Sequence, residues 1–231
     1  PPIEHKVTPL DGAANDEFGV AVSVSGDVAV VGAFGNDDNG SSSGSAYVFR
    51  WDGSAWVEEQ KLLALDGASD DNFGISVSVS IDVAVVGANA DGDNGTNSGS
   101  AYVFRWNGSS WEEEQELLAS DGAEGDVFGE SVSVSGDVAV VGAPRKTGVA
   151  PLSGSAYVFR WDGSAWQEEQ KLVASDGESG DKFGISVSVS GDVAVVGAYG
   201  DDDNGDFSGS AYMFRWNGSA WAEEQKLRAS D

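Results

Sequence analysis

Acidic side chains recur at fixed positions in glycine-rich loops of this sequence, and their oxygens are the ligands that calcium prefers. Three loops, at residues 36–40, 91–95 and 201–205, offer side-chain oxygens at their first and third positions. These positions are Asn36, Asp38, Asp91, Asp93, Asp201 and Asp203. Because both are Asp in the loops at 91–95 and 201–205, we expect weak Ca²⁺ binding there. The alternative is that the side chains only stabilise Asx-turns.

A second acidic pattern precedes each of four Phe-Gly dipeptides. It consists of two aspartates five residues apart: Asp11 and Asp16, Asp66 and Asp71, Asp121 and Asp126, Asp176 and Asp181. The pattern persists in the third unit, whose loop at 146–150 has no acidic residue. We therefore expect these aspartates to stabilise turns rather than to hold a cation.

All eight tryptophans occur in pairs five residues apart, and each pair flanks a turn containing Gly-Ser. The pairs are Trp51 and Trp56, Trp106 and Trp111, Trp161 and Trp166, and Trp216 and Trp221. A spacing repeated in every unit predicts that the rings pack across a hairpin. If exposed, the rings would instead stack on sugars, as in lectins.

Four Asn-x-Ser/Thr sequons lie in expected surface turns, at Asn39, Asn94, Asn107 and Asn217. They predict glycosylation if the chain passes through a eukaryotic secretory pathway. Groups for catalysis are scarce, because His5 is the only histidine and there is no cysteine. The many serines alternate with valine or lie in turns, without a base nearby. The sequence therefore predicts a protein that is not an enzyme.

The charge balance is strongly acidic, with 39 Asp and Glu against 12 Lys and Arg and a formal net charge of −27. Nucleic acids and anionic membranes bind clustered Lys and Arg, so neither is an expected partner. No apolar run in the sequence is long enough to cross a membrane as a helix. We therefore expect no membrane insertion.

The four Phe-Gly dipeptides, which begin at Phe18, Phe73, Phe128 and Phe183, recur every 55 residues. The repeats span approximately 11–65, 66–120, 121–175 and 176–231, in one domain covering 1–231. Each repeat predicts four strands, which in the first are residues 20–25, 28–33, 45–51 and 56–62. Four-stranded units at this period are typical of an all-β propeller with antiparallel blades. The chain supplies four blades, and the ring closes within it or is completed by another chain.

The motifs also resemble a known family. Phe-Gly, then Val-Gly-Ala, then an Asp-rich loop followed by Ser-Gly-Ser-Ala-Tyr is similar to the FG-GAP repeats of integrin α-chains and many surface proteins. The resemblance covers all four units. It implies a propeller, an extracellular location and, often, calcium in the loop between the second and third strands. The third loop departs from this pattern.

The termini predict an unbalanced strand count. Residues 4–11 align one period before residues 59–66, so residues 3–10 form an extra outer strand, and residues 224–229 form another. A surplus strand can pair with an open sheet edge on another chain. The residues expected at such a joint are His5, Lys6, Val7, Lys226 and Leu227. The alternatives are a frayed first strand or a chain cut from a longer propeller.

Together these patterns predict an extracellular structural or adhesive repeat protein. We expect it to assemble with copies of itself, as a fibre or a closed oligomer, by exchange of outer strands, with calcium stiffening some loops. The alternative is a propeller module of a larger surface protein that binds carbohydrates or extracellular proteins. Glycan binding that is lost when the tryptophans are replaced would favour that alternative.

Overall fold

The computed structural model describes residues 4–229, and within them every regular element is a β-strand. The first repeat forms β1 (Val22–Ser25), β2 (Val28–Ala33), β3 (Ser45–Trp51) and β4 (Trp56–Leu62). The later repeats form β5 (Ser76–Ser80), β6 (Val83–Ala88), β7 (Ser100–Trp106), β8 (Trp111–Leu117), β9 (Ser131–Ser135), β10 (Val138–Ala143), β11 (Ser155–Trp161), β12 (Trp166–Leu172), β13 (Ser186–Ser190), β14 (Val193–Ala198), β15 (Ser210–Trp216) and β16 (Trp221–Leu227). No helix of the described chain is long and apolar enough to span a membrane.

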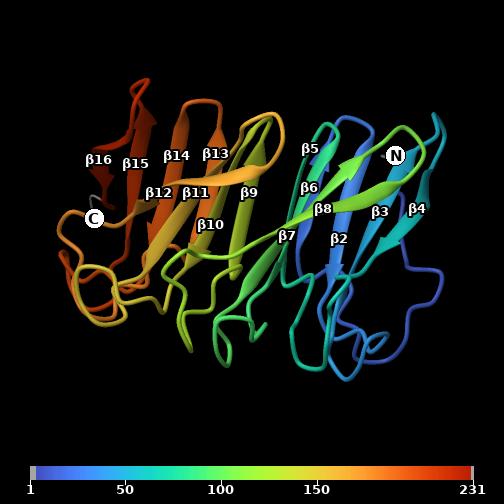
Figure 1. Cartoon of the computed structure of the whole chain (residues 1–231), viewed down its shortest axis with the longest axis horizontal. Helices are drawn as coiled ribbons and strands as arrows, with labels where there is room; N and C mark the ends of the chain where they lie inside the picture. Colours follow the sequence, from blue (N-terminus) through green and yellow to red (C-terminus); the bar gives the residue numbers. More distant parts are fainter. Residues whose placement is uncertain (1–3, 230–231) are drawn as a thin grey trace.

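Each repeat folds into one antiparallel sheet of four strands in sequence order, which confirms the all-β fold and the four-stranded units. The innermost strands contact one another in series, β1 with β5, β5 with β9, and β9 with β13. Figure 1 shows the sheets in a row along the longest axis, with the first and fourth at opposite ends. The sheets therefore form a propeller-like arc that is open over residues 4–229.

Local sequence explains the hairpins inside each sheet. Gly26-Asp27 joins β1 to β2, and Gly26 has a φ of 61°, in the left-handed region that glycine adopts without a steric penalty. At the other hairpin, Asp52 Oδ1 accepts hydrogen bonds from the amides of Ser54 and Ala55, both at 2.8 Å. This Asx-turn places Trp51 opposite Trp56 in the strand register.

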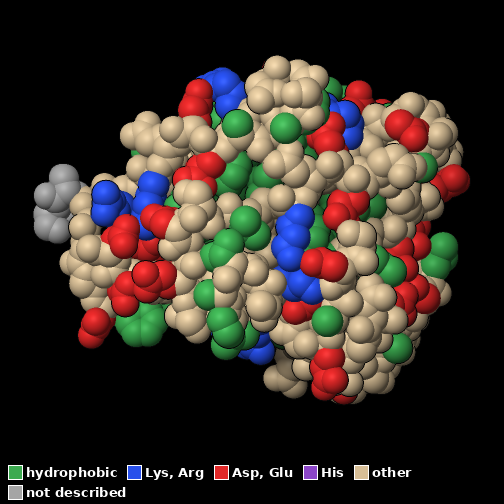
Figure 2. All heavy atoms as spheres, turned by 60° about the vertical axis from the view of Figure 1, so that its left-hand side comes forward, with side chains coloured by type: hydrophobic (Ala, Val, Ile, Leu, Met, Phe, Trp, Pro, Cys, Tyr) green, Lys and Arg blue, Asp and Glu red, His purple; other side chains and the backbone are tan. Residues whose placement is uncertain are grey.

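Acidic side chains are scattered over the surface. Figure 2 shows Asp and Glu side chains spread over one side of the molecule, with fewer Lys and Arg side chains among them. The second strands are instead apolar, and in the two middle sheets, where neighbouring sheets cover both faces, they are fully buried. In β6, for example, every residue is buried.

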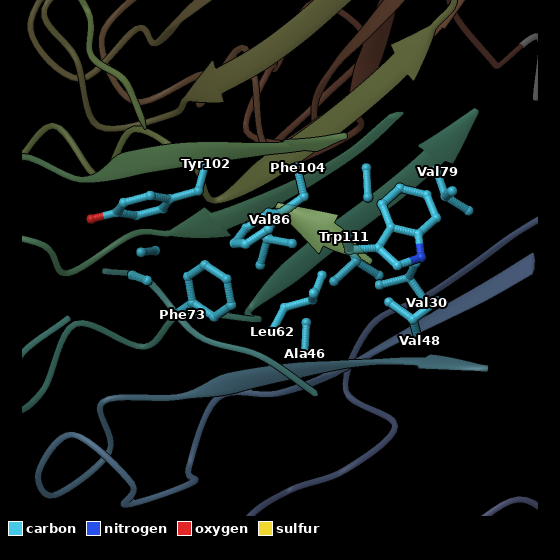
Figure 3. Packing of buried hydrophobic residues seen from close by; sticks show 14 of the residues in the cluster. Val30, Ala46, Val48, Leu62, Phe73, Val79, Val86, Tyr102, Phe104 and Trp111 are labelled. Carbon is cyan, nitrogen blue, oxygen red and sulfur yellow. The ribbon is translucent and has the colours of Figure 1, made fainter. Parts of the chain in front are cut away.

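The hydrophobic core consists of three equivalent clusters, one between each pair of neighbouring sheets, and a smaller fourth cluster on the first sheet. Figure 3 shows the first, where Leu62 and its neighbours on the first sheet face Phe73, Phe104 and Trp111 of the second. The sheets approach so closely that a Cβ on Gly32 would lie 1.9 Å from the carbonyl oxygen of Gly74. Glycine is therefore required where the Phe-Gly of one repeat meets the preceding sheet.

The extra outer strand expected over 3–10 does not form in this structure. Residue 3 lies outside the described chain, and residues 4–9 have no regular structure. The segment nevertheless lies on the first sheet, where Val7 packs against Val31, Tyr47 and other apolar residues. The amide of Leu10 donates to Glu58 Oε2 at 2.8 Å, as the amide of Leu65 does to Glu113 in the next repeat. Residues 4–10 thus lie on the first sheet as the last strand of a preceding sheet would, but they have no partner strand among the described residues.

Candidate functional site

Each repeat builds the same polar cluster at the edge of its sheet. A fully buried tyrosine of the third strand donates its hydroxyl hydrogen bond to the first aspartate of the repeat. The pairs are Tyr47 with Asp11 (2.8 Å), Tyr102 with Asp66 (3.0 Å), Tyr157 with Asp121 (2.6 Å) and Tyr212 with Asp176 (2.9 Å). This bond brings the aspartate next to the loop between the second and third strands, where the acidic pattern had predicted calcium.

In three of the four repeats, a lysine of the fourth strand neutralises this cluster. Lys226 Nζ lies 2.9 Å from Asp176, 2.6 Å from Asp201 and 2.6 Å from Asp203. Burial opposes the charged form, but these hydrogen bonds outweigh it and raise the pKa of Lys226. Lys61 likewise contacts Asp11 and Asp38, and Lys171 contacts Asp121.

These contacts bear on two of the expected calcium loops. Asp201 and Asp203 are brought together, and the ammonium group of Lys226 lies 2.6 Å from a carboxylate oxygen of each. Asp38 is paired with Lys61, and the amide of Asp38 donates to Asn36 Oδ1 at 3.2 Å in an Asx-turn. In both loops the lysine of the fourth strand supplies the positive charge.

The second repeat differs because Glu116 stands where the other repeats have lysine. Oxygen atoms of Asp66, Asp93 and Glu116 all lie within 4.8 Å of one another. Asp91 is 5% exposed and accepts a hydrogen bond from Tyr102 at 3.0 Å. Four carboxyl groups thus gather here, and none of them forms an ion pair among the described residues.

The pKa values of the carboxyl groups in the second repeat reflect the replacement of lysine by Glu116. Burial, together with the negative charges of Asp93, Asp66 and Asp91, raises the pKa of Glu116 to about 7. Burial and Asp91 also raise the pKa of Asp93. In the fourth repeat, by contrast, the hydrogen bonds from Lys226 hold the pKa of Asp201 below its usual value in spite of burial.

The residues of the second repeat fit a calcium ion. Oε1 of Glu116 is buried without a hydrogen-bond partner among the described residues, so it has an unused acceptor. The donor set consists of carboxylate oxygens, which suit a hard cation such as Ca²⁺. The loop pattern did not reveal Glu116 or Asp66, although the change from lysine to Glu116 is visible when the repeats are aligned.

The second aspartate of each acidic pattern has the structural role that we expected. Asp71 Oδ2 accepts a hydrogen bond from the amide of Ala68 at 2.6 Å, and the same bond recurs in each repeat. The bond closes a short turn directly before Phe-Gly. It fixes the approach of Phe73 to the preceding sheet.

The tryptophan pairs pack as predicted, with ring centroids 5.8–6.0 Å apart. The second tryptophan of the last three pairs is also buried against the preceding sheet, where Trp111 Nε1 donates to Glu59 at 3.1 Å. The first tryptophan lies under an arginine of that sheet, with Arg50 4.9 Å from the centroid of Trp106. Both rings of the last three pairs thus contact the preceding sheet, whereas Trp51 and Trp56 of the first pair are partly buried and have no preceding sheet in the described chain. The four sequon residues, Asn39, Asn94, Asn107 and Asn217, are exposed.

Neighbouring sheets are joined by one set of polar contacts that recurs at all three junctions. Gln60 accepts from the amide of Trp111 at 2.8 Å and donates to its carbonyl oxygen at 2.7 Å. Gln115 and Gln170 bind Trp166 and Trp221 in the same way. Close to the centre, the amide of Val79 donates to Ser23 Oγ at 3.0 Å, and this bond also recurs.

At the two ends of the arc the same residues have no neighbouring sheet. Val22 and Val24 of the first sheet are 70% and 65% exposed, whereas their equivalents Val77 and Val79 are 8% and 6% exposed. On the fourth sheet, Leu227 is 40% exposed, while Leu62, Leu117 and Leu172 are each 1% exposed. Both ends therefore present a surface that is core elsewhere in the chain.

The fold and these junctions define a class, the propeller-like repeat proteins built from sheets stacked around an axis. The FG-GAP repeat family matches residues 3–49, 56–104, 111–159 and 166–214, which is most of the chain. This protein therefore belongs to the FG-GAP repeat family, as its motifs predicted. No curated protein matches the sequence.

Proposed function

We propose that this chain is a non-enzymatic, extracellular structural module that assembles with copies of itself. The observation that carries the proposal is the open arc, whose two ends expose junction residues without a neighbouring sheet. Unsatisfied apolar faces of this kind favour association. The near-identity of the repeats suits such an assembly, because a further sheet from another copy would present the same side chains.

A non-enzymatic role is supported by the distribution of the polar groups. The tyrosine–aspartate pair and the lysine or glutamate beside it recur once per repeat, as scaffold positions do. An extracellular role is supported by the family resemblance and by the four exposed sequons, which would carry glycans.

Two routes of assembly are open at these ends. In the first, residues 4–10 of one copy replace β16 beside β15 of another, which is the outer-strand exchange that the sequence predicts. In the second, the exposed faces of the first and fourth sheets stack. Both routes join unlike surfaces, so the assembly either closes into a ring or grows into a fibre.

Sedimentation equilibrium of residues 1–231 over a wide concentration range tests the proposal. The expected result is a mass that rises from that of one chain, 23.8 kDa, to a multiple of it. A mass of one chain at every concentration, with the protein folded, would overturn self-assembly by either route.

We also propose that the second repeat binds Ca²⁺ through Asp66, Asp91, Asp93 and Glu116. At a free calcium concentration about tenfold above Kd, binding to the folded chain alone stabilises it by about 1.4 kcal/mol. The test compares thermal unfolding in calcium, in magnesium and in chelator. Glu116→Lys, which restores the lysine of the other repeats, should abolish the calcium response, whereas Glu112→Lys at an exposed position of the same strand should keep it. A calcium response that survives in Glu116→Lys would place the ion elsewhere.

A further inference from the structure

The three internal junctions show what a complete contact between two of these sheets requires. The preceding sheet supplies the glutamine and glutamate that bind a tryptophan, the arginine above another, and serine hydroxyls near the centre. The following sheet supplies the two tryptophans, backbone amides and the phenylalanine of Phe-Gly. The junction is therefore heterologous, with an accepting face and an inserting face.

The fourth sheet exposes an accepting face with the same side chains. It has Glu224 and Gln225 where Glu59 and Gln60 bind Trp111, and Arg215 where Arg50 covers Trp106. Its serines at 188 and 190 match Ser23 and Ser25, whose hydroxyl oxygens accept amides of the next sheet. The glutamate, glutamine, arginine and serine side chains of the accepting face are thus repeated here.

A groove of about 490 Å³ on this face marks where a phenylalanine is absent. Gly197, Gly209, Ala211 and Leu227 line it. Their equivalents in the first sheet are Gly32, Gly44, Ala46 and Leu62, which contact Phe73-Gly74. A Cβ on Gly44 would meet the carbonyl oxygen of Phe73 at 2.0 Å, whereas a Cβ on Gly209 would meet nothing closer than 3.6 Å. The groove is therefore the equivalent of the place where a Phe-Gly dipeptide packs at each internal junction.

The first sheet exposes the matching inserting face. Phe18 is half-buried, whereas Phe73, Phe128 and Phe183 are at most 1% exposed. A Cβ on Gly19 would meet nothing within 4 Å, because no preceding sheet lies beside it. Trp56 is likewise half-buried, and Val22 and Val24 are exposed.

From this complementarity we propose that the fourth sheet of one copy binds the first sheet of a second copy, with Phe18-Gly19 in the groove beside Gly197. The inference rests on the proposed self-assembly and names its surface. Propellers contain roughly four to eight blades, and four of these sheets leave the arc open. Two copies supply eight sheets, so two identical junctions close a dimer.

The N-terminal segment competes with this contact. Residues 4–10 lie on the inserting face, with the ring of His5 5.4 Å from that of Trp51 and Val7 in the apolar cluster. Val7 and Leu227 are both equivalent to Leu62 in the alignment of the repeats. Val7 of one copy and Leu227 of a docked second copy would therefore occupy the same position on the inserting face. β16 pairs with β15 along six registered positions, while residues 4–9 pair with no strand. The segment therefore leaves the first sheet when a second copy docks, and β16 stays.

The proposal is tested with one variant at each face. Val22→Glu places a charge on the inserting face at a side chain that is exposed in a single copy, so folding is preserved. Gly197→Val fills the groove on the accepting face. The control is Val57→Glu, the same change at a 50% exposed position where the next repeat already has Glu112.

The masses of these variants should follow a simple pattern in light scattering. Val57→Glu should form dimers like the unaltered chain, whereas Val22→Glu and Gly197→Val should each weaken dimerisation at least about tenfold. An equimolar mixture of those two variants keeps one intact face of each kind, so it should form a dimer that neither forms alone. Circular dichroism verifies that each variant is folded.

A chain lacking residues 1–8 separates this proposal from outer-strand exchange. We expect the deletion to tighten dimerisation, because the competing segment is gone. Loss of dimers on deletion, or unchanged dimers in both Val22→Glu and Gly197→Val, would overturn the proposal while leaving self-assembly intact. A single-chain mass for the unaltered protein would overturn both.

Discussion

Ile81 is a β-branched residue in a backbone conformation that suits its type poorly. It occupies the turn between β5 and β6 with a φ of 59°, where the other repeats have Gly26, Gly136 and Gly191 at 56–61°. A left-handed conformation costs a residue with a Cβ roughly 1–2 kcal/mol, and branching at Cβ adds to it. Its side chain is 75% exposed, so packing recovers little of this energy.

We therefore predict that Ile81→Gly raises the free energy of unfolding by about 1 kcal/mol, since relief of strain exceeds the added entropy of the unfolded chain. Urea denaturation measures the change. The reciprocal substitution Gly136→Ile in the third repeat should lower stability by a similar amount. Equal or lower stability of Ile81→Gly would contradict the account of this turn.

Glu116 makes stability depend on pH in the absence of calcium. Its pKa is about 7 in the folded chain, above its ordinary value of 4.5, so the folded state binds this proton more tightly than the unfolded state does. The contribution is present at low pH and is lost as the pH rises from about 4.5 to about 7. The negative charges of Asp93, Asp66 and Asp91 add to the effect of burial, because they repel the ionised form of Glu116 and so raise its pKa.

The predicted outcome is that calcium-free protein becomes more stable between pH 7 and pH 5.5, and that Glu116→Lys removes this gain. Glu116→Lys should also be the more stable protein at pH 7, since its ammonium would pair with Asp66 and Asp93. Chemical denaturation at both pH values measures the effect. A difference between the two pH values that is the same in both proteins would show that Glu116 is not its source.

At the scale of the elements, neighbouring sheets depend on glycine at the place of closest approach. A Cβ on Gly142 would lie 1.9 Å from the carbonyl oxygen of Gly184. Because this oxygen belongs to the backbone, it cannot move aside as the end of a flexible side chain could. Gly197 is the same position of the fourth sheet, and its nearest neighbour is the movable Ser186 Oγ at 2.6 Å.

Gly142→Ala should therefore destabilise the chain by about 3 kcal/mol, the upper range for overpacking, and Gly197→Ala by less than about 1 kcal/mol. The free energies of unfolding of the two variants are compared by denaturation at a low protein concentration, at which the chain is monomeric. Similar losses in both variants would mean that the fourth sheet is not open at this position.

Much of this architecture could be predicted from the sequence. Residues 28–33, 45–51 and 56–62 were predicted as strands with the bounds that the structure has, because glycine turns and alternating apolar residues delimit them. The first strand begins at Val22 rather than residue 20, since Phe18-Gly19 and Val20 belong to the turn that enters the sheet. Strand bounds can be predicted from local patterns of this kind because they depend on contacts within one sheet.

What the sequence could not predict depends on several elements at once. The lysine that neutralises the acidic loop of the first and of the fourth repeat comes from the fourth strand, so Lys226 meets Asp201 only after the whole sheet has formed. Whether the arc closes depends on how each sheet packs against the next. This packing involves two repeats, so the sequence of one repeat does not determine it. The N-terminal segment was wrongly expected to form a strand, because its pattern matches β4 but the described chain offers it no partner strand.

For the whole molecule, the net charge of −27 opposes the approach of two copies. The proposed contact is instead apolar and hydrogen-bonded, and its Arg215 is already paired with Glu224 at 2.9 Å. Salt screens the repulsion without weakening the apolar contact. We predict that dimerisation tightens between about 0.05 M and 0.5 M NaCl, as measured by sedimentation. Dissociation by salt would indicate a joint held by ion pairs.

The central claim is that two open arcs complete one ring, and electron cryomicroscopy of the assembled chain tests it most directly. The account predicts a closed ring of eight sheets with a two-fold axis, in which Phe18 of each copy lies in the groove beside Gly197 of the other. Single open arcs, or copies joined by their outer strands into filaments, would contradict it.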